Sequence, residues 1–437
     1  MTPAARLLAT IEALESADTL RRPLDAALRD YFATRRYAGS KDRSAVSELA
    51  FMVARRRGEL DVRLTAANVK RTMANRVALV AGTAGFGADA TYAPPALSPE
   101  VLAGLERAVA IPEGRTRLPG AFEGRLAQRF RTAGPGQEDP VAHEQMLAEV
   151  ASLLDHAPVD LRVAGDREVA RAALAELGLV ANPTPWSPIG LRLVPDGNPP
   201  NFRGILASSE LLRSGEAEVQ DEGSQLASLF VQASAGQTVL DRCAGAGGKA
   251  LAIADLTAGK AKILACDVNA ARLQSLEGRV RTDAARAAIT TEVVPPRTGR
   301  LNGRTFDRVL CDVPCTGSGT VRRAPDLPWR LSESELAETV RTQAAILDEC
   351  EPLVAPRGRL VYVTCSLFEE ENDAQTKAFL SRNPNFHLVP AHQIWAALGL
   401  PSGPDGAAPP FVRGGTLLLS PRRSQTDGFF VAVFERD

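Results

Sequence analysis

The spacing of apolar residues separates a helical first part of the chain from a later part in which strands and helices alternate. In the first part, apolar residues recur at helical spacing in two stretches, Leu7–Leu14 and Val46–Val53. Glycine, proline and polar residues then cluster over 131–140, which is typical of a linker. The pattern therefore predicts an all-α domain over residues 1–135.

A short mixed region follows the linker. Apolar runs at 161–163 and 191–194 predict two strands, and the segment between them predicts a helix near 167–177. Several prolines between positions 183 and 200 end this region. We interpret residues 136–218 as a small α+β linker subdomain.

Beyond this subdomain, short apolar runs alternate with helical segments. Four runs predict strands, at 239–241, 263–267, 306–312 and 359–365. Helical segments lie between them, such as 270–288. This alternation predicts a mostly parallel sheet with helices on both faces, and hence an α/β fold over 219–437. The late apolar runs at 416–420 and 428–434 are close enough to form an antiparallel hairpin at one edge.

The distribution of charge adds one observation to this picture. The whole chain has a net charge of −1, but residues 1–80 contain fifteen Lys and Arg against nine Asp and Glu, an excess of six. Basic residues gather at Arg35–Arg43 and Arg55–Arg57. A basic segment on a neutral protein favours a polyanionic partner, although a solvated helical surface has the same composition.

Cysteine and histidine usage argues against a metal site and a disulfide framework. None of the six cysteines forms a CxxC pair, and the four histidines are scattered. The chain has no apolar run long enough to span a bilayer and no apolar signal segment at its start. We therefore expect no metal, no membrane partner and a cytoplasmic location, because free thiols persist in a reducing compartment. We also expect a monomer.

A glycine-rich loop follows the first predicted strand of the α/β region. The loop opens a helix, and Asp267 ends the next strand 19 residues after Gly248. Glycines permit a tight turn and close approach of a ligand, and an acid at this place can accept hydrogen bonds from a ribose diol. Neither the phosphate-loop pattern GxxxxGK[ST] nor the dinucleotide pattern GxGxxG is present. The alternative is a turn that only tightens the joint between a strand and a helix.

A nucleoside ligand without a pyrophosphate fits this loop best, and S-adenosylmethionine is the predicted cofactor. An amino-acid moiety and a ribose need a turn and an acid, whereas a pyrophosphate needs an anion cradle. The predicted cofactor contacts are Asp267, Asp312 and the loop residues Cys243, Ala244, Gly245, Ala246, Gly247, Gly248 and Lys249.

Two cysteines stand at the ends of later strands. Cys315 follows the strand at 306–312, and Cys365 ends the strand at 359–365. Ligands of such sheets bind beyond the carboxyl ends of the strands, so both thiols can reach one pocket. The remaining cysteines within predicted elements are expected to be small core residues, namely Cys266, Cys311 and Cys350.

A thiol at this place suits methylation of a pyrimidine ring carbon. Carbon 5 of cytosine is a poor nucleophile, but addition of a thiolate to carbon 6 turns the ring into an enamine whose carbon 5 can attack a sulfonium methyl. Asp312, when protonated or sharing a proton with ring nitrogen 3, can stabilise the charge on the ring. Lys249 can either depress the pKa of a thiol or hold Asp312 in place. A base must then remove the proton on carbon 5 before the thiol leaves.

These segments resemble the RsmB/Nop/Sun family of RNA (cytosine-5)-methyltransferases, and most closely its bacterial small-subunit ribosomal RNA members. The matching segments occur in the family's order within 215–437, at 219–228, 241–249, 265–267, 312–329, 363–366 and 427–430. The Pro-Cys pair at 314–315, combined with Thr-Cys-Ser at 364–366 and RRxPD at 322–326, is highly specific. KDRSAV at 41–46 makes the first helices similar to the NusB-like RNA-binding domain of these members, a weaker match.

The resemblance implies a Rossmann-like class I methyltransferase domain and a role for several residues. It makes Cys365 the nucleophile, Cys315 the cysteine that helps to release the product, and Asp312 the acid that contacts the base. It also implies that Arg322 and Arg323 face the RNA backbone. Residue type alone would make Cys315 the nucleophile, because DNA cytosine methyltransferases use the cysteine of a Pro-Cys loop.

Two segments depart from the family pattern. Ala-Gly-Ala at 244–246 replaces Ala-Ala-Pro in the glycine-rich loop. The family also has an acid near the adenine of the cofactor, after its third strand. This chain reads TEVVPP at 291–296, where Glu292 is the only acid. The second departure weakens the case for tight binding of the cofactor.

The preferred interpretation is an enzyme that methylates carbon 5 of a cytosine in RNA, with small-subunit ribosomal RNA as the expected partner. Methylation of transfer RNA by the same chemistry is the first alternative. Amino-group methylation fits less well, because it needs an aromatic residue where Cys315 stands and leaves Cys365 unused. A non-catalytic RNA-binding assembly factor with a degenerate cofactor pocket is the third alternative, and binding of S-adenosylmethionine would argue against it.

Overall fold

The computed structural model describes residues 1–88, 92–114, 117–130, 140–296, 299–402, 409, 411–413 and 415–437. These residues form two compact units. The first unit contains Met1–His156 together with Thr320–Ser332, and the second contains Ala157–Gly319 and Glu333–Asp437. The predicted linker at 131–140 lies outside the described residues except for Pro140, which begins a helix, and the predicted boundary at residue 135 lies outside them too.

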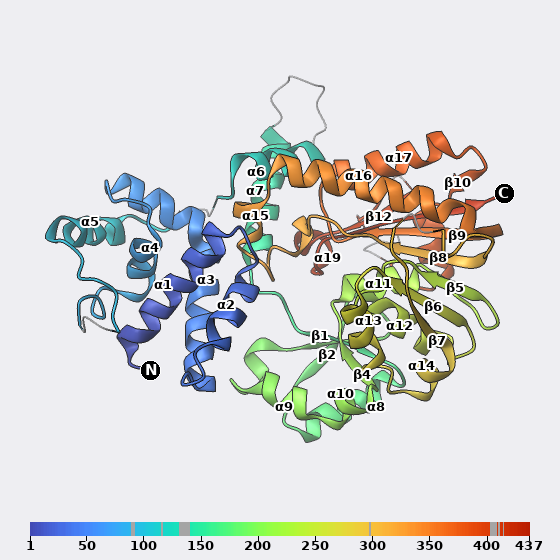
Figure 1. Cartoon of the computed structure of the whole chain (residues 1–437), viewed down its shortest axis with the longest axis horizontal. Helices are drawn as coiled ribbons and strands as arrows, with labels where there is room; N and C mark the ends of the chain where they lie inside the picture. The colour runs from blue at the N-terminus through green and yellow to red at the C-terminus, as the bar shows by residue number, and fades with distance from the viewer. Residues whose placement is uncertain are drawn as a thin grey trace. The chain divides into compact units, whose positions relative to one another are not determined.

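The described part of the first unit is helical, as the spacing of its apolar residues predicts (Figure 1). Val46, Ala50 and Val53 are buried on one face of the longest helix of this unit, where they pack against Ile11 and Leu14. The helices are α1 Pro3–Thr19, α2 Leu24–Ala33, α3 Ser40–Ala66, α4 Met73–Ala81, α5 Pro99–Ala110, α6 Gly120–Arg129, α7 Pro140–Leu154 and α15 Leu327–Arg330.

The segment Thr320–Ser332 packs with the first unit although it is distant from the other helices in sequence. The main-chain N–H of Leu24 donates to the carboxylate of Asp326 at 3.2 Å. The guanidinium of Arg57 lies 4.6 Å from the centroid of the Trp329 ring. The apolar pattern did not predict this packing, because periodicity reports a buried face without naming its partner.

A small antiparallel sheet opens the second unit. Its strands are β1 Asp160–Val163, β2 Ala181–Pro183, β3 Gly190–Leu193 and β4 Ala217–Val219, in the order β2-β3-β1-β4. The accompanying helices are α8 Arg167–Glu176, the 3-10 turn η1 Pro195–Gly197, α9 Phe202–Ser208 and α10 Glu210–Ser214. Strands β1 and β3 and helix α8 occupy the segments predicted from the apolar runs, whereas β2 and β4 were not predicted.

The larger sheet has the order β11-β12-β13-β9-β8-β5-β6-β7, and β10 pairs with β13. The strands from β9 to β7 are parallel, which confirms the predicted α/β fold. The predicted late hairpin is confirmed as β12 and β13, but β13 also pairs with β9. The strands are β5 Thr238–Asp241, β6 Lys262–Asp267, β7 Ile289–Val293, β8 Phe306–Asp312, β9 Val354–Thr364, β10 Phe386–Leu388, β11 Val412–Arg413, β12 Thr416–Leu419 and β13 Phe429–Arg436.

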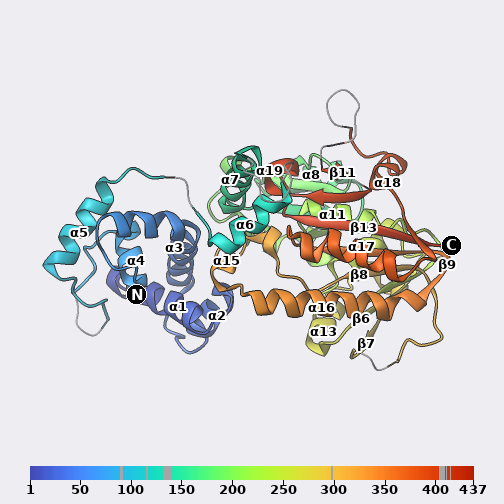
Figure 2. The ribbon, with the colours of Figure 1, turned by 90° about the horizontal axis from the view of Figure 1, so that it is seen from above.

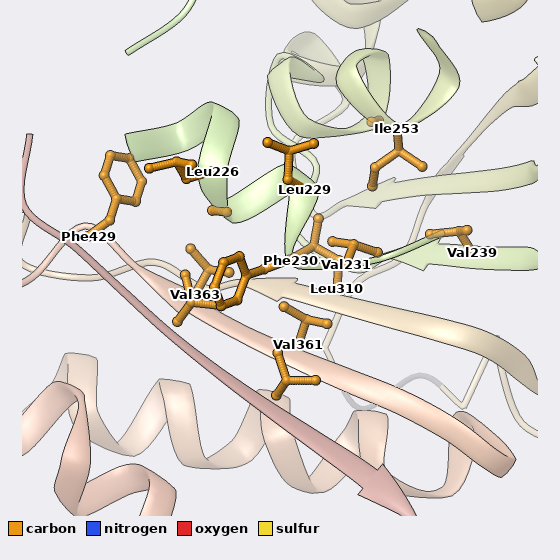
Figure 3. Close-up of a cluster of buried hydrophobic side chains, with 14 of the residues drawn as sticks. Leu226, Leu229, Phe230, Val231, Val239, Ile253, Leu310, Val361, Val363 and Phe429 are labelled. Atoms are coloured by element: carbon orange, nitrogen blue, oxygen red, sulfur yellow. The ribbon is translucent and has the colours of Figure 1, made fainter. Parts of the chain in front are cut away.

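Helices cover both faces of this sheet. On one face α11 and α12 pack over a core of branched apolar residues from the strands, among them Val239, Leu310 and Val361 (Figure 3). On the other face α16 packs beside α17 (Figure 1 and Figure 2). The helices are α11 Glu222–Leu229, α12 Gly248–Leu256, α13 Ala270–Glu277, α14 Asp283–Ala288, η2 Ser318–Thr320, α16 Glu333–Cys350, η3 Glu351–Leu353, η4 Glu369–Glu371, α17 Asp373–Arg382, α18 Ala391–Ala397 and α19 Pro421–Ser424.

The helix predicted over 270–288 is interrupted between α13 and α14. Gly278 ends α13, and the Thr282 side chain accepts a hydrogen bond from the Ala285 N–H and so begins a second helix. Continuous apolar spacing concealed this break, because it does not register a capping side chain.

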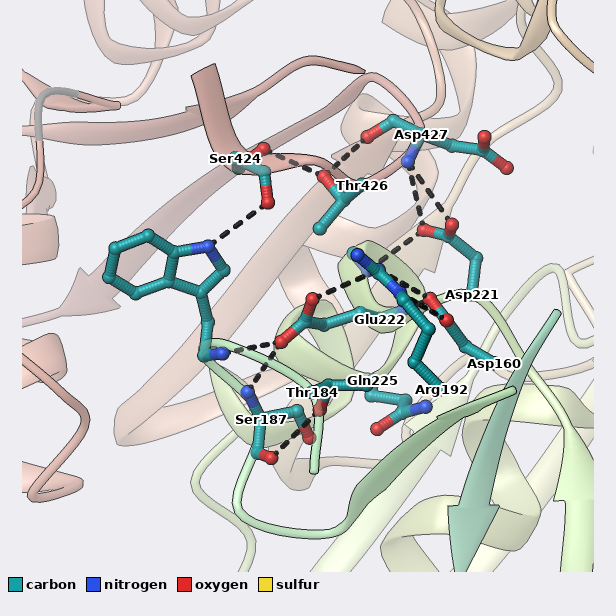
Figure 4. Close-up of polar contacts among 12 residues, drawn as sticks. Asp160, Thr184, Ser187, Arg192, Asp221, Glu222, Gln225, Ser424, Thr426 and Asp427 are labelled. Atoms are coloured by element: carbon teal, nitrogen blue, oxygen red, sulfur yellow. Dashed lines mark hydrogen bonds and ion pairs between the residues drawn. The ribbon is translucent and has the colours of Figure 1, made fainter. Parts of the chain in front are cut away.

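A buried polar network joins the small sheet to helix α11 (Figure 4). Arg192 pairs with Asp160 at 2.7 Å and with Glu222 at 3.3 Å, and Glu222 also accepts the Ser187 N–H at 2.8 Å. Burial raises the pKa of Glu222 to about 7. This effect outweighs the hydrogen bonds from the N–H groups of Ser187 and Trp186 and the charge of Arg192, which lower the pKa. The network holds the small sheet against the element that precedes β5.

Candidate active site

The glycine-rich loop leaves β5 and enters α12 at Gly248. Gly245 and Gly247 have φ angles of 56° and 84°, in the left-handed region that glycine adopts without strain. A Cβ atom on Gly247 would lie 2.0 Å from Cδ1 of Leu276, so this position also requires the absence of a side chain. The loop therefore depends on glycine for both its conformation and its packing.

Asp267 lies at the carboxyl end of β6, beside this loop. One carboxylate oxygen accepts the Gly245 N–H at 2.9 Å, and the other accepts the Asn269 N–H at 2.8 Å. A carboxylate can accept about four hydrogen bonds, so acceptor capacity remains for a ligand. The predicted acid is therefore held in place by the loop that it was predicted to assist.

A cavity of about 1100 Å³ is lined by residues at the carboxyl ends of β5, β6, β8 and β9. This volume accommodates a ligand of cofactor size. Of the predicted site residues, Gly247 alone does not line the cavity, since it packs on Leu276. The others line it together, namely Cys243, Ala244, Gly245, Ala246, Gly248, Lys249, Asp267, Asp312, Cys315 and Cys365.

Lys249 and Asp312 form an ion pair inside this cavity, with 2.6 Å between Nζ and Oδ2. Burial disfavours the charge of Lys249, but the adjoining Asp312 carboxylate raises its pKa above the usual value. The Lys249 ammonium also lies 5.4 Å from the centroid of the Phe429 ring. Of the two roles considered for Lys249, this geometry favours holding Asp312 over activating a thiol.

Cys315 and Cys365 are in contact, with 3.2 Å between their sulfur atoms. The Cys365 N–H donates to the sulfur of Cys315 at 3.3 Å. The hydrogen bond between the two thiols, together with burial, holds the pKa of Cys315 well above its usual value. The remaining strand and helix cysteines are buried as predicted, namely Cys266, Cys311 and Cys350.

Two residues near the cavity were not singled out from the sequence. Arg242 lines the cavity and pairs with Glu349 at 3.2 Å. Asp241 ends β5 and is buried, and burial followed by the negative charge of Asp312 raises its pKa to about 7. Their position between the strand and the glycine-rich loop could have indicated that they lie near the site. The sequence alone, however, does not show which side chains point toward the cavity.

The segment at 291–296 supplies Pro296 to the cavity. Its acid, Glu292, pairs with Arg304 at 3.1 Å and is not among the residues that line the cavity. Among the described residues, this segment therefore offers no carboxylate to the cavity.

Two expectations about arginines are wrong in part. Arg322 is only 5% exposed, so it does not face an RNA backbone, whereas Arg323 is exposed. The Arg55–Arg57 cluster makes contacts within the first unit. Arg55 donates to the main-chain oxygen of Leu154 at 2.9 Å, and Arg57 pairs with Asp18 at 2.7 Å. The cluster at Arg35–Arg43 differs, because Arg36, Lys41 and Arg43 are exposed.

No group of three or more His, Cys, Asp or Glu side chains among the described residues could hold a metal ion. No helix in the described part of the chain is long and apolar enough to cross a membrane.

The chain is similar in sequence to known RNA methyltransferases. Residues 228–435 match the family model described as 16S rRNA methyltransferase RsmB/F. The probable ribosomal RNA small subunit methyltransferase B of Bacillus subtilis (strain 168) is 33% identical over 240 residues, which cover 54% of this chain and 51% of that protein. The ribosomal RNA small subunit methyltransferase B of Vibrio cholerae is 35% identical over 228 residues, which cover 51% of this chain and 46% of that protein. The chain thus spans about half the length of these relatives.

Solved structures resemble the fold. The crystal structure of PH0851 has a TM-score of 0.71 at 24% identity and covers 100% of this chain and 99% of that one. The structure of NSun6 from Pyrococcus horikoshii with SFG has a TM-score of 0.57 at 18% identity, and the match covers 71% of this chain and 97% of that one. These likenesses agree with the Rossmann-like methyltransferase fold predicted for the α/β region. Together with the family match and the sequence relatives, they lead to one conclusion: residues 228–435 of this chain resemble the RsmB/F methyltransferases.

Proposed function

We propose that this protein transfers a methyl group from S-adenosylmethionine to carbon 5 of a cytosine in small-subunit ribosomal RNA. One observation carries the proposal. Cys315 and Cys365 are 3.2 Å apart in a cavity that also contains a glycine-rich loop and Asp267. Two thiols at such a place suit a reaction in which one forms a bond to the ring and the other assists its release.

The residues of the cavity fit S-adenosylmethionine. Asp267 retains acceptor capacity for the ribose hydroxyls. The loop residues from Cys243 to Ala246, and Gly248, line the cavity where the amino-acid moiety would lie. The phosphate-loop pattern is absent, which agrees with a cofactor that has no pyrophosphate. When bound, S-adenosylmethionine supplies an electrophilic methyl group.

The side chains divide the chemistry among themselves. Cys365 passes its proton to water, and its sulfur bonds to carbon 6 of the cytosine while the ring π electrons move toward carbon 5. Asp312, held by Lys249, shares a proton with ring nitrogen 3, at the edge where negative charge develops. Bonding of Cys365 to the ring removes its hydrogen bond with Cys315, which then loses its own proton to water. After carbon 5 has gained the methyl group, the Cys315 thiolate removes the proton from that carbon. The freed electron pair restores the double bond and expels the Cys365 thiolate.

The assignment of the nucleophile follows the family resemblance. The two sulfur atoms are 3.2 Å apart, and either can donate the hydrogen bond between them. The Cys365 N–H also donates to the sulfur of Cys315. A trapping experiment distinguishes the two thiols.

The first unit supplies affinity for RNA in this proposal. Arg36, Lys41 and Arg43 are exposed around the turn between α2 and α3, and the Tyr37 side chain among them is 71% exposed. Basic groups attract the phosphate backbone, and an exposed aromatic ring can stack on an unpaired base. We place the RNA contact of this unit at that turn. A monomeric, cytoplasmic protein also remains our prediction.

The two cysteine assignments predict opposite outcomes in a trapping experiment. Cys315→Ala should attack and transfer the methyl group but fail to release the product, so a protein–RNA adduct should survive denaturing electrophoresis. Cys365→Ala should form neither adduct nor product, because bond formation to carbon 6 is lost. An adduct with Cys365→Ala and none with Cys315→Ala would make Cys315 the nucleophile.

The identity of the substrate needs a separate test. RNA from cells that lack the gene should be incubated with the purified protein and S-adenosylmethionine, and 5-methylcytosine mapped by bisulfite sequencing. A new site in small-subunit ribosomal RNA supports the proposal, and a site only in transfer RNA supports the first alternative. Absence of cofactor binding would support the non-catalytic assembly factor, which the loss of the adenine-side acid at 291–296 slightly favours.

A further inference from the structure

The loops that carry the two cysteines share a buried carboxylate outside the cavity. Glu371 is completely buried in the short helix η4, and it does not line the cavity. Burying a carboxylate is costly unless its oxygens are hydrogen-bonded. The donors that surround Glu371 therefore indicate what its burial accomplishes.

Glu371 binds the residue that follows each cysteine. One oxygen accepts the main-chain N–H of Thr316 at 2.8 Å, and the other accepts the Thr316 hydroxyl at 2.5 Å. The second oxygen also accepts a short hydrogen bond from the Ser366 hydroxyl. Thr316 is adjacent to Cys315, and Ser366 is adjacent to Cys365. One side chain thus connects two loops that are 50 residues apart in the sequence.

Neighbouring side chains complete this connection. Gln343 of α16 donates to Glu371 and to the main-chain oxygen of Pro314, each at 3.0 Å, so the Cys315 loop is held on both sides of the cysteine. Asn372 accepts the Thr364 hydroxyl at 2.6 Å and donates to the main-chain oxygen of Ser366 at 2.8 Å. The Cys365 loop is therefore held on both sides as well.

The hydrogen bonds to Glu371 fit a role in positioning better than a role in proton transfer. Its carboxylate accepts four donors, from the Thr316 N–H, the Thr316 hydroxyl, the Ser366 hydroxyl and Gln343. That number fills the capacity of a carboxylate, so no lone pair is left to take a proton from a thiol. It holds the cysteines through the two adjacent residues, and its negative charge also contributes to the raised pKa of Cys315.

We propose that Glu371 is a positioning residue that keeps the thiols of Cys315 and Cys365 in contact by hydrogen bonding to the residue after each. The contact between the two thiols is argued from geometry alone. Its importance for catalysis depends on the function proposed above. Without Glu371 the two loops lose their shared acceptor and separate, even if the sheet itself remains folded.

The rate of disulfide formation depends on how closely the two thiols approach, and it can be followed without RNA or cofactor. The diazene oxidant diamide takes two electrons and two protons from a pair of thiols and becomes a hydrazine while the sulfur–sulfur bond forms. The disulfide-linked peptide that joins Cys315 and Cys365 is quantified by mass spectrometry over time in the full chain. Four proteins are compared, namely the wild type, Glu371→Gln, Glu371→Ala and the control Glu222→Ala.

The control removes another fully buried carboxylate from the same unit, one bonded to Ser187 and Arg192 instead of the cysteine loops. We expect Glu371→Ala to form the Cys315–Cys365 disulfide about ten-fold more slowly or worse, because small misplacements have large effects on rate. Glu222→Ala should lose stability but keep the wild-type rate. Glu371→Gln should keep most of the rate, because the amide oxygen can accept from the Thr316 N–H while the NH2 group donates to the two hydroxyl oxygens, whose protons turn away from it.

Several results would overturn the proposal. A folded Glu371→Ala that forms the disulfide at the wild-type rate would do so, and so would an equal slowing in Glu222→Ala. If Glu371→Ala does not fold, the double variant Thr316→Val, Ser366→Ala removes one donor from each loop, and a wild-type rate in that protein would have the same meaning.

A methylation assay links the geometry to the chemistry. In Glu371→Ala, kcat should fall in parallel with the rate of disulfide formation while KM for RNA stays near its wild-type value, since Glu371 does not line the cavity. Absence of methylation by the wild type would refute the proposed function and leave the disulfide comparison to decide the role of Glu371. A normal kcat in a variant that forms the disulfide slowly would show that methylation does not need the contact between the two thiols.

Discussion

Replacement of Asp267 tests the proposed cofactor site most directly. In the structure its two oxygens accept the N–H groups of Gly245 and Asn269, and the carboxylate lies in the wall of the cavity. A carboxylate can accept about four hydrogen bonds, so one or two positions remain for the ribose hydroxyls. Asp267→Ala removes these acceptors and the anchor of the glycine-rich loop at once.

The size of the expected effect follows from the bonds lost. A hydrogen bond to a charged group contributes about 1.5–3 kcal/mol, and each ~1.4 kcal/mol changes Kd about ten-fold. Loss of one such bond should therefore weaken binding of S-adenosylmethionine about 10-fold to 150-fold, and loss of two should weaken it further. Asp267→Asn should fall between the wild type and Asp267→Ala, because its amide keeps one acceptor oxygen.

Isothermal titration calorimetry with S-adenosylmethionine measures these affinities, after circular dichroism has verified folding. Asp283→Ala is the matched control, because Asp283 is a fully exposed aspartate on nearby α14 and does not line the cavity. Cys365→Ala should also bind the cofactor normally, since the Cys365 thiol is assigned to attack on the cytosine and not to cofactor binding. An unchanged Kd in folded Asp267→Ala would remove Asp267 from the site.

Three further predictions concern the loop, the buried network and the first unit. Gly247→Ala should lower the free energy of unfolding by about 2–5 kcal/mol in urea denaturation, because of its positive φ and the contact with Leu276, whereas Gly278→Ala, at φ −66°, should not. Burial raises the pKa of Glu222 to about 7 from 4.5, so the folded protein favours the protonated form of this side chain. As the pH rises from 4.5 to 7, the wild type should therefore lose up to about 3 kcal/mol of stability relative to Glu222→Gln. A difference in stability that does not change with pH would contradict this prediction. Tyr37→Ala should weaken RNA binding about five-fold or more without changing its salt dependence, Arg36→Ala should reduce the salt slope by about 1, and Tyr92→Ala, another exposed tyrosine, should do neither.

The class of fold and most of the cavity follow from the pattern of residues along the chain. Short apolar runs alternating with helical segments require a parallel sheet, and the carboxyl ends of parallel strands meet at one edge. A motif that follows a strand is therefore placed at that edge by local sequence alone. The glycine-rich loop, Asp267, Asp312 and the two cysteines were found for this reason, and all of these except Gly247 line one cavity.

Contacts between side chains from distant segments depend on how the chain packs. Cys315 and Cys365 could each be assigned to a strand end, but their contact depends on β8 and β9 being neighbours and on the register between them. Glu371 was not identified, because it lies in a short turn and acts on residues that are distant in sequence. The same limit applies to Thr320–Ser332, which packs with the first unit, and to Arg55 and Arg57, whose charges are used in internal contacts. Periodicity and composition show that a residue is buried or basic, whereas its partner is set by packing between distant segments.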